Sequence, residues 1–115
     1  MKNINTKVTC TKQVFSKHQS VCKTYSPIQA AYAKILEDDP DVAKFQTNVK
    51  LTDLDFDGAT YSTDFLITKT NGDVIVRECI KRTYLMRPKK LQMLDASREY
   101  WANHGVTDWG LVIDA

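Results

Sequence analysis

A hairpin with clear strand and turn signals is the feature of this sequence that most constrains its fold. Residues 61–68 and 74–80 are rich in β-branched and aromatic side chains, which favours two strands. The segment 70–72 between them, Thr-Asn-Gly, has the composition of a tight turn. The pattern predicts an antiparallel hairpin with one acidic residue in each strand, Asp64 in the first and Glu78 in the second.

The length of the turn decides where these two acids lie. A three-residue loop with Gly72 in the left-handed position pairs Lys69 with Asp73. This register puts Asp64 opposite Glu78 on one face of the hairpin. A two-residue turn at 71–72 would pair Asp64 with residue 79 and send the acids to opposite faces. We favour the longer loop.

Two facing carboxylates point to chemistry because they repel each other, and proteins rarely place them together without a cation. A divalent metal ion between Asp64 and Glu78 would suit cleavage of a phosphodiester. The alternative is that both acids are exposed charges on the solvated side of an antiparallel sheet.

The composition is that of an ordinary globular domain. With 115 residues, 43% of them hydrophobic, the chain fits one domain with a real core. We find no apolar run of membrane-spanning length and no signal-peptide pattern, so we expect no membrane association and a cytoplasmic location. Three cysteines, an odd number, argue against a disulfide framework and favour reduced thiols.

The positive charge is concentrated at the N-terminus. The net charge is only +2, but the first acidic residue is Glu37, so residues 1–36 carry +6 and the remainder carries −4. Residues 1–24 are polar and contain short β-favouring pieces, which predicts a basic N-terminal arm or one edge strand. Such an arm could contact phosphates, and a solvated tail is the alternative.

A helix is predicted to begin at Ser26-Pro27, because serine caps helices well and proline suits the first helical position. It ends before Pro40, since the residue preceding a proline avoids the helical region. Residues 41–45 are then predicted as a connector, 47–54 as a strand and 53–58 as an acidic turn. The apolar residues at helical spacing predict the buried stripe of the helix, with Gln29 on an adjoining stripe; they are Ile28, Ala31, Tyr32, Ile35 and Leu36.

A second, longer helix is predicted over residues 88–103, after a basic segment at 81–90. Its predicted buried side includes Leu91, Leu94, Trp101 and Ala102, with Arg98 as the polar exception. The last strand, 109–113, should lie parallel to a neighbour after this crossover. The fold class is therefore α/β, a three-layer domain over residues 25–115 with a mixed central sheet flanked by helices.

These elements resemble a known family. The order and spacing of its motifs are similar to the TnsA-type transposase endonuclease N-terminal domain, a member of the restriction-endonuclease-like PD-(D/E)xK superfamily. The resemblance covers about residues 24–114. The segments that carry it are Asp39-Pro40-Asp41-Val42, Thr63-Asp64-Phe65, Val76-Arg77-Glu78-Cys79, Leu94-Asp95-Ala96-Ser97-Arg98 and Trp109-Gly110-Leu111-Val112-Ile113.

The resemblance implies a restriction-endonuclease-like fold and a metal-dependent DNA endonuclease subunit of a multi-protein transposition system. Such a subunit hydrolyses phosphodiester bonds at the ends of the transposon. The implied partners are double-stranded DNA, a transposase subunit and a regulatory ATPase, and a homodimer is compatible with this role. The implied cofactor is Mg²⁺ or Mn²⁺, which prefers hard oxygen ligands.

The resemblance also assigns site residues by position. Asp64 resembles the metal-binding aspartate and Glu78 the acidic residue of a Glu-x-Lys pair, with the carbonyl of Cys79 as a backbone metal ligand. Gln29 lies on the helix where many members carry a glutamate that helps hold metal. The lysine expected two residues after Glu78 is replaced by Ile80.

The missing lysine leaves several candidates for the catalytic amine. Lys81 is one residue late and points away from Glu78 on a regular strand, unless the strand ends or bulges near residue 80. Lys89 or Lys90 on the next helix could serve instead. The residues predicted to bind DNA are Lys81, Arg82, Arg87, Lys89 and Lys90.

Two other classes of protein remain open at this point. The first is a catalytically silent nuclease-fold domain that binds DNA or a transposition partner, which Ile80 and Gln29 favour. The second is a small α/β interaction module with no role in DNA chemistry.

Overall fold

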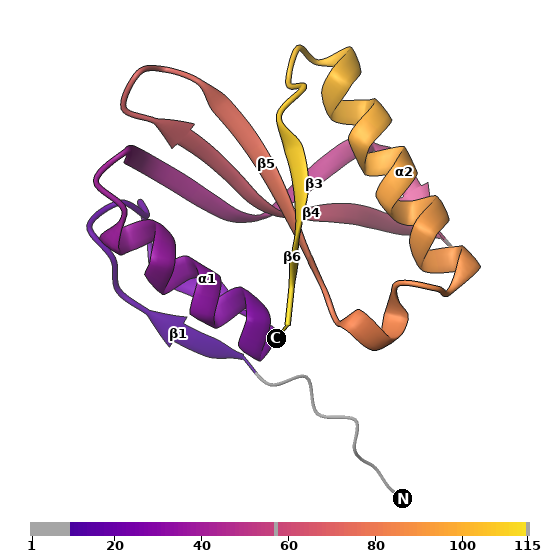
Figure 1. Cartoon of the computed structure of the whole chain (residues 1–115), viewed down its shortest axis with the longest axis horizontal. Coiled ribbons are helices and arrows are strands. Elements are labelled where there is room, and N and C mark those ends of the chain that lie inside the picture. The colour runs from indigo at the N-terminus through magenta and orange to yellow at the C-terminus, as the bar shows by residue number, and fades with distance from the viewer. Residues whose placement is uncertain (1–9, 57, 115) are drawn as a thin grey trace, which may run out of the picture.

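The computed structural model describes residues 10–56 and 58–114 of the chain. These residues form an α/β fold in which two helices accompany a central sheet (Figure 1). The elements in chain order are β1 (Thr11–Gln13), β2 (Cys22–Thr24), α1 (Pro27–Asp38), β3 (Val42–Phe56), β4 (Ala59–Lys69), β5 (Val74–Ile80), the 3₁₀ helix η1 (Arg82–Tyr84), α2 (Pro88–Asn103) and β6 (Trp109–Ile113).

The main sheet is mixed, as the sequence predicts. Its strand order is β3-β4-β5-β6. The strands β3, β4 and β5 pair antiparallel in succession, and β6 pairs parallel with β5 after the crossover through α2. The prediction of a mixed α/β fold with a parallel last strand is therefore confirmed.

The two helices pack on opposite faces of this sheet. The neighbouring residues Ile75 and Val76 of β5 belong to two different hydrophobic clusters, and successive side chains of a strand point to opposite faces. One cluster contains Leu36 of α1, and the other contains Trp101 of α2. Each helix therefore covers one face, and β5 lies between the two cores.

Helix α1 begins and ends as predicted, but it buries a different side. Ser26 caps its N-terminus by accepting a hydrogen bond from the backbone N–H of Gln29. The buried residues are Gln29, Ala33 and Leu36, whereas Ile35 of the predicted stripe is 58% exposed. The predicted stripe is thus partly wrong, because polar contacts of the Gln29 side chain turn the adjoining stripe toward the sheet.

Helix α2 has the predicted bounds and also shows a shifted buried side. Ser97 and Trp101 are buried, whereas Leu91 is 42% exposed and Arg98 lies on the surface beside Asp95. The prediction that placed Arg98 on the buried stripe is wrong. The physical reason is that the Ser97 hydroxyl hydrogen-bonds to groups of β5 and β6.

The strand β3 is longer than the sequence predicts. Segment 41–45 was expected as a connector, yet β3 already begins at Val42, because the partner strand β4 continues far enough to pair Val42 with Lys69 and Phe45 with Ile67. The predicted acidic turn also starts too early, since residues 53 and 55 lie within β3. Residue 57 of that turn lies outside the described residues.

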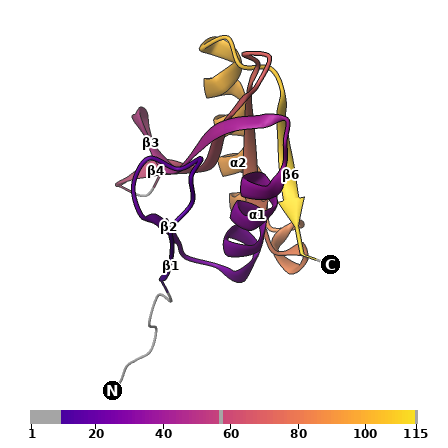
Figure 2. The same cartoon turned by 90° about the vertical axis from the view of Figure 1, so that its left-hand side faces the viewer.

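Residues 11–24 form a hairpin of their own, where the sequence predicted an arm or one edge strand. Thr11 pairs with Thr24 and Gln13 with Cys22. Cys22 is fully buried in the cluster on the α1 side, and β2 contacts both α1 and β3 (Figure 2). The first residues of the predicted arm, 1–9, lie outside the described residues. The three cysteines are free thiols, as predicted.

Candidate functional site

The register of the central hairpin follows the longer of the two predicted turns. The backbone N–H of Lys69 donates to the carbonyl of Asp73 at 2.8 Å, and Gly72 has a left-handed φ of 94°. Successive pairs run back along the strands as far as Phe65 opposite Arg77. The next residues in this register are Asp64 and Glu78, so the two-residue turn is excluded.

The alternation of β4 reverses at Asp64. Phe65 packs in the cluster on the α1 face. Tyr61 instead packs against the cluster on the α2 face, and the Thr63 hydroxyl accepts a hydrogen bond from the Trp101 indole there. All three positions are odd-numbered, so a regular strand would put them on one face. The strand therefore changes faces between Thr63 and Phe65.

The neighbouring strand β3 changes faces at the adjacent position. Phe45 packs on the α1 face, whereas Val49 packs on the α2 face, although both positions are odd-numbered and a regular strand would put them on one face. Asn48 lies between them with a left-handed φ of 55°. Its expected partner in the register is Asp64. The two long strands thus switch faces side by side, and this switch turns the backbone of Asp64 toward Glu78.

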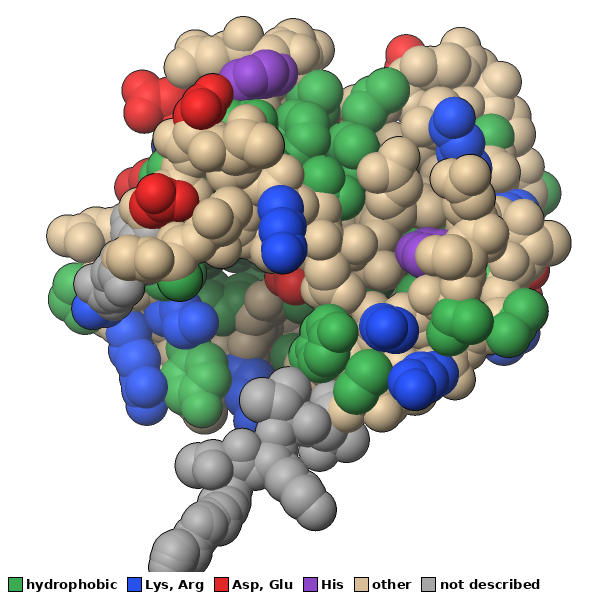
Figure 3. Space-filling view, turned by 180° about the vertical axis from the view of Figure 1, so that it is seen from behind, with side chains coloured by type: hydrophobic (Ala, Val, Ile, Leu, Met, Phe, Trp, Pro, Cys, Tyr) green, Lys and Arg blue, Asp and Glu red, His purple; other side chains and the backbone are tan. Residues whose placement is uncertain are grey.

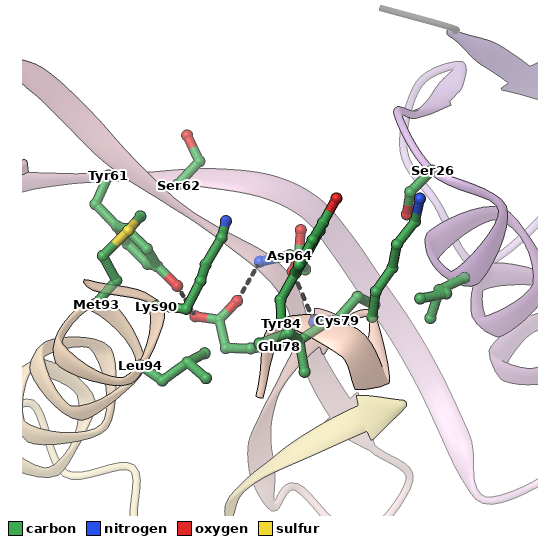
Figure 4. Close-up of a pocket in the computed structure, with 13 residues that line it drawn as sticks. Ser26, Tyr61, Ser62, Asp64, Glu78, Cys79, Tyr84, Lys90, Met93 and Leu94 are labelled. Atoms are coloured by element: carbon green, nitrogen blue, oxygen red, sulfur yellow. Dashed lines mark hydrogen bonds between the residues drawn. The ribbon is translucent and has the colours of Figure 1, made fainter. Parts of the chain in front are cut away.

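Asp64 and Glu78 bind each other's strand through their carboxylates (Figure 4). The backbone N–H of Asp64 donates to Oε1 of Glu78 at 2.8 Å, and the backbone N–H of Cys79 donates to Oδ2 of Asp64 at 2.7 Å. Glu78 is only 1% exposed. The alternative of two solvated surface acids is therefore wrong: these carboxylates are built into the junction of the strands.

The second oxygen of Glu78 accepts three side-chain hydrogen bonds. The donors to Oε2 are the Tyr61 hydroxyl at 2.9 Å, the Thr63 hydroxyl at 3.1 Å and the Ser97 hydroxyl at 2.6 Å. The indole N–H of Trp101 donates to Thr63, and that of Trp109 donates to Ser97. Because an indole N–H can only donate, both hydroxyls are free to direct their protons to Glu78.

The sequence predicts a buried position for Trp101 but does not predict that either tryptophan orients a hydroxyl group. Trp101 and Trp109 do pack in the core, but each also orients a hydroxyl on Glu78. Ser97 received no role at all. The available signal was a serine one turn before Trp101 on the buried side of a long helix, where a polar side chain needs a partner.

Burial controls the ionisation of both acids. Burial and, second, the negative charge of Glu78 raise the pKa of Asp64 to about 7, although the N–H of Cys79 and the positive charge of Lys90 act in the opposite direction. Burial likewise raises the pKa of Glu78, against the hydrogen bonds from its donors. The pKa values of both acids are therefore raised, and the charge of this interacting pair changes well above the pH at which free carboxylates ionise.

A cleft of about 310 Å³ opens beside the acids. Figure 4 shows Asp64, Glu78, Lys90 and Tyr84 among its lining side chains. The complete lining is Ser26, Ile28, Tyr61, Ser62, Asp64, Glu78, Cys79, Ile80, Lys81, Tyr84, Lys90, Met93 and Leu94. The structure thus brings Lys81 and Lys90 to the same cleft as the two acids.

The other predicted basic residues lie differently. The Arg87 guanidinium lies over the Tyr84 ring at 4.2 Å, next to the cleft. Arg82 is directed elsewhere, since its backbone N–H and its side chain both donate to Asp114. Neither Arg82 nor Lys89 lines the cleft. Figure 3 shows that the face opposite to that of Figure 1 is hollowed, with Lys and Arg side chains around the hollow.

Gln29 lies beside Asp64, although it does not line the cleft. It is 2% exposed, and its amide nitrogen donates to the Asn48 side chain at 2.9 Å and to Oδ1 of Asp64 at 3.3 Å. Its amide oxygen accepts the backbone N–H of Tyr25. The neutral amide thus occupies a position from which a carboxylate would face Asp64.

Within the described ranges, no group of three or more His, Cys, Asp and Glu side chains could hold a metal ion. The side-chain ligands on offer at the cleft are therefore the two carboxylates. A carboxylate has about four acceptor sites. Oε2 of Glu78 already accepts three donors, but Oε1 accepts one, and Oδ1 of Asp64 accepts only the long bond from Gln29. One oxygen of each acid thus keeps acceptor capacity.

No protein-family model matches the chain, and no curated protein matches it. Among the helices of the described residues, none has the length and apolar character needed to cross a membrane.

Proposed function

We propose that this chain is a divalent-metal-dependent DNA endonuclease with a restriction-endonuclease-like fold, acting in the cytoplasm as the nuclease subunit of a DNA transposition system. The observation that carries the proposal is the junction of Asp64 and Glu78, which joins two acids on neighbouring strands at the wall of a cleft that also contains two lysines.

The donor set fits a hard cation such as Mg²⁺ or Mn²⁺, because the free acceptor capacity lies on carboxylate oxygens. Asp64 and Glu78 would hold the ion, with the Cys79 carbonyl as a backbone ligand. When bound, such an ion neutralises charge on a phosphate and acidifies a water molecule. Two carboxylates bind a cation weakly by themselves, so phosphate oxygens of DNA would be needed as further ligands.

The remaining residues of the cleft bind and orient the DNA. The ammonium groups of Lys81 and Lys90 offset the negative charge of the DNA backbone in the cleft. Arg87 and Lys89 contact neighbouring phosphates at the start of α2, where no side chain caps the helix. These contacts position the duplex without reading its sequence. The proposed partners of the subunit are a transposase subunit and a regulatory ATPase.

Nicking of a supercoiled plasmid with Mg²⁺ or Mn²⁺ tests this function. We expect the native chain to convert supercoiled plasmid to open circles, and Asp64→Asn and Glu78→Gln to lose this activity. Asp55→Asn is the matched control, because Asp55 is an exposed acid on β3 and does not line the cleft. Nicking that persists in both cleft variants would refute the proposal.

A catalytically silent domain that binds DNA or a transposition partner is the second candidate. The observation that favours it is the saturation of Oε2 of Glu78 by three donors, together with Ile80 at the position of the expected lysine. A protein that never nicks beside its transposase, yet binds DNA with a salt dependence lost in an Arg87→Ala, Lys89→Ala, Lys90→Ala variant, would establish this candidate.

A further inference from the structure

We infer that Lys90, on the first turn of α2, is the catalytic residue that supplies the ammonium group at the scissile phosphate. This inference rests on the proposed endonuclease function. According to this inference, helix α2 supplies the positive charge that strand β5 does not supply.

The strand wall offers no cation next to Glu78. Ile80 is 6% exposed and lines the cleft with its hydrocarbon side chain, two residues beyond Glu78 on the same face of β5. A hydrocarbon cannot stabilise the negative charge that develops on a phosphate. A cation for that charge must therefore reach the acids from another element.

Lys90 meets this requirement from the opposite wall. It lines the same cleft as Asp64 and Glu78, and Figure 4 shows its side chain extending from α2 into that cleft. Its positive charge acts on the Asp64 carboxyl. Among the described residues, Lys90 makes no direct ion pair with either acid. The ammonium and the two carboxylates thus line one cleft without a direct ion pair between them, and the cleft has a volume of about 310 Å³.

The other basic residues of the segment have different positions. The Lys81 ammonium lies 5.9 Å from the centre of the Tyr84 ring, and the Arg87 guanidinium lies 4.2 Å from the same centre, so Lys81 belongs to a cation–aromatic group. Arg82 hydrogen-bonds to Asp114. Of the two lysines that line the cleft, Lys90 is therefore the one whose charge acts on Asp64 and which, within the described part of the chain, belongs to no cation–aromatic group.

The role of Lys90 is electrostatic and involves no proton transfer from its side chain. The oxygen of the attacking water forms a bond to phosphorus, and the bond from phosphorus to one deoxyribose oxygen breaks. The water releases one proton to solvent, and the departing oxygen takes one proton from solvent. Lys90 keeps its three protons and donates a hydrogen bond to a non-bridging phosphate oxygen, which carries more negative charge in the transition state.

The test compares single-turnover nicking rates at saturating protein with Mn²⁺ for the native chain, Lys90→Met, Lys90→Arg and Lys81→Met. Loss of one preorganised donor to a developing oxyanion costs about 10²–10³-fold in rate. We expect a loss of this size for Lys90→Met, with an equilibrium Kd for a DNA duplex raised less than about tenfold, as for one lost phosphate contact. Lys90→Arg should retain part of the rate, because it keeps the positive charge.

Two further variants complete the comparison. Lys81→Met, which removes the other lysine of the cleft, should weaken DNA binding and lower the rate at saturation less than Lys90→Met does. Lys34→Met is the matched control, because Lys34 is exposed on α1, pairs with Asp38 and does not line the cleft. Thermal melting of each variant establishes that it folds.

The outcomes separate this inference from the proposed function. Native-like nicking by folded Lys90→Met, with nicking lost in Lys81→Met, overturns the role of Lys90 and leaves the endonuclease function in place. A Lys90→Met defect that disappears at saturating protein makes Lys90 a binding residue and also overturns the role. Absence of nicking by the native chain overturns the function and the inference together.

Discussion

At the scale of single residues, the ionisation of Asp64 links the site to stability. The pKa of Asp64 is raised from 3.8 to about 7 by burial and by the charge of Glu78. Below 3.8 the carboxyl is protonated in both the folded and the unfolded chain. As the pH rises toward 7, the unfolded chain releases this proton and the folded chain retains it, so the free energy of unfolding falls. Above pH 7 the carboxyl is charged in both states, and the free energy of unfolding is lowered by the full cost of burying this charge.

An Asp64→Asn substitution should therefore stabilise the protein at pH 8 and change little at pH 4. The amide oxygen can still accept the Cys79 N–H, while the buried charge is gone. Since about 1 kcal/mol shifts the melting temperature of a domain near this size by several degrees, we expect an increase of about 5 °C or more at pH 8. Thermal melting of the native chain and the variant, followed by circular dichroism at both pH values, measures this change in melting temperature. Asp55→Asn, on the surface, should show no such pH-dependent gain, and a lower melting temperature for Asp64→Asn at pH 8 would contradict the argument.

Gln29 sets the charge of the site in a second way. Its amide donates a hydrogen bond to Oδ1 of Asp64 and thereby stabilises the negative charge there. A glutamate at this position would instead add to the repulsion between the carboxylates. Gln29→Glu should bring a third carboxylate to the junction and tighten Mn²⁺ binding by about tenfold or more, because ligand charge governs the affinity of hard cations. Without metal, the same variant should melt at a lower temperature, since it buries another charge.

Isothermal titration with Mn²⁺ and thermal melting with and without the ion measure both effects. Gln92→Glu adds the same charge on an exposed part of α2 and serves as the control. Equal Mn²⁺ affinity of Gln29→Glu and the native chain would show that no cation binds at this junction.

At the scale of elements, the change of faces in β3 depends on the backbone of Asn48. Its left-handed φ of 55° costs an ordinary L-residue about 1–2 kcal/mol, and asparagine and glycine tolerate it best. Asn48→Gly and Asn48→Ala both lose the side-chain bonds to Gln29 and to the Lys23 carbonyl. The difference between the two variants therefore isolates the backbone.

We expect Asn48→Gly to be more stable than Asn48→Ala by about 1 kcal/mol in urea unfolding. The same pair of substitutions at Gln46, an exposed residue paired regularly with Leu66, should give the opposite order, because glycine weakens a regular strand. If Asn48→Ala were as stable as Asn48→Gly or more stable, the strand would not need the left-handed backbone conformation at position 48.

The sequence predicts those elements whose signals are local. Ser26 and Pro27 define the start of α1, and Gly72 defines the hairpin register, so the meeting of Asp64 and Glu78 is predictable from neighbouring residues. The buried faces of the helices are not, because they depend on partners distant in the chain. Gln29 is buried through a bond to Asp64, and Ser97 through bonds to β5 and β6.

The change of faces in β3 and β4 cannot be predicted from the sequence either, because it also depends on partners distant in the chain. Apolar residues at odd positions continue through β3 and β4 on both sides of the switch, so the alternation in the sequence looks uninterrupted. Only the pairing of Asn48 beside Asp64, together with the two separate cores, reveals where the strands turn. The site lies at this switch, where the regular pattern of the sheet is broken.

At the scale of the whole molecule, one buried carboxylate joins elements that are distant in the chain. Glu78 of β5 binds Tyr61 and Thr63 of β4, and Ser97 of α2. Ser97 in turn accepts the indole N–H of Trp109 on β6. The core on the α2 face is therefore held by a polar network as well as by apolar packing, and each member is costly to remove because its partners are then left unpaired.

Ser97→Ala should destabilise the whole fold, because it removes a donor from the buried Glu78 and leaves the Trp109 N–H without its acceptor. The expected loss in the free energy of urea unfolding is about 1–3 kcal/mol. In a double-mutant cycle with Trp109→Phe, the losses should be less than additive, since the phenylalanine has no N–H to leave unpaired. Ser20→Ala, at an exposed serine, should change stability by less than about 0.5 kcal/mol. A Ser97→Ala variant as stable as the native chain would mean that packing alone holds α2 on the sheet, and that the orientation of Glu78 does not depend on the helix.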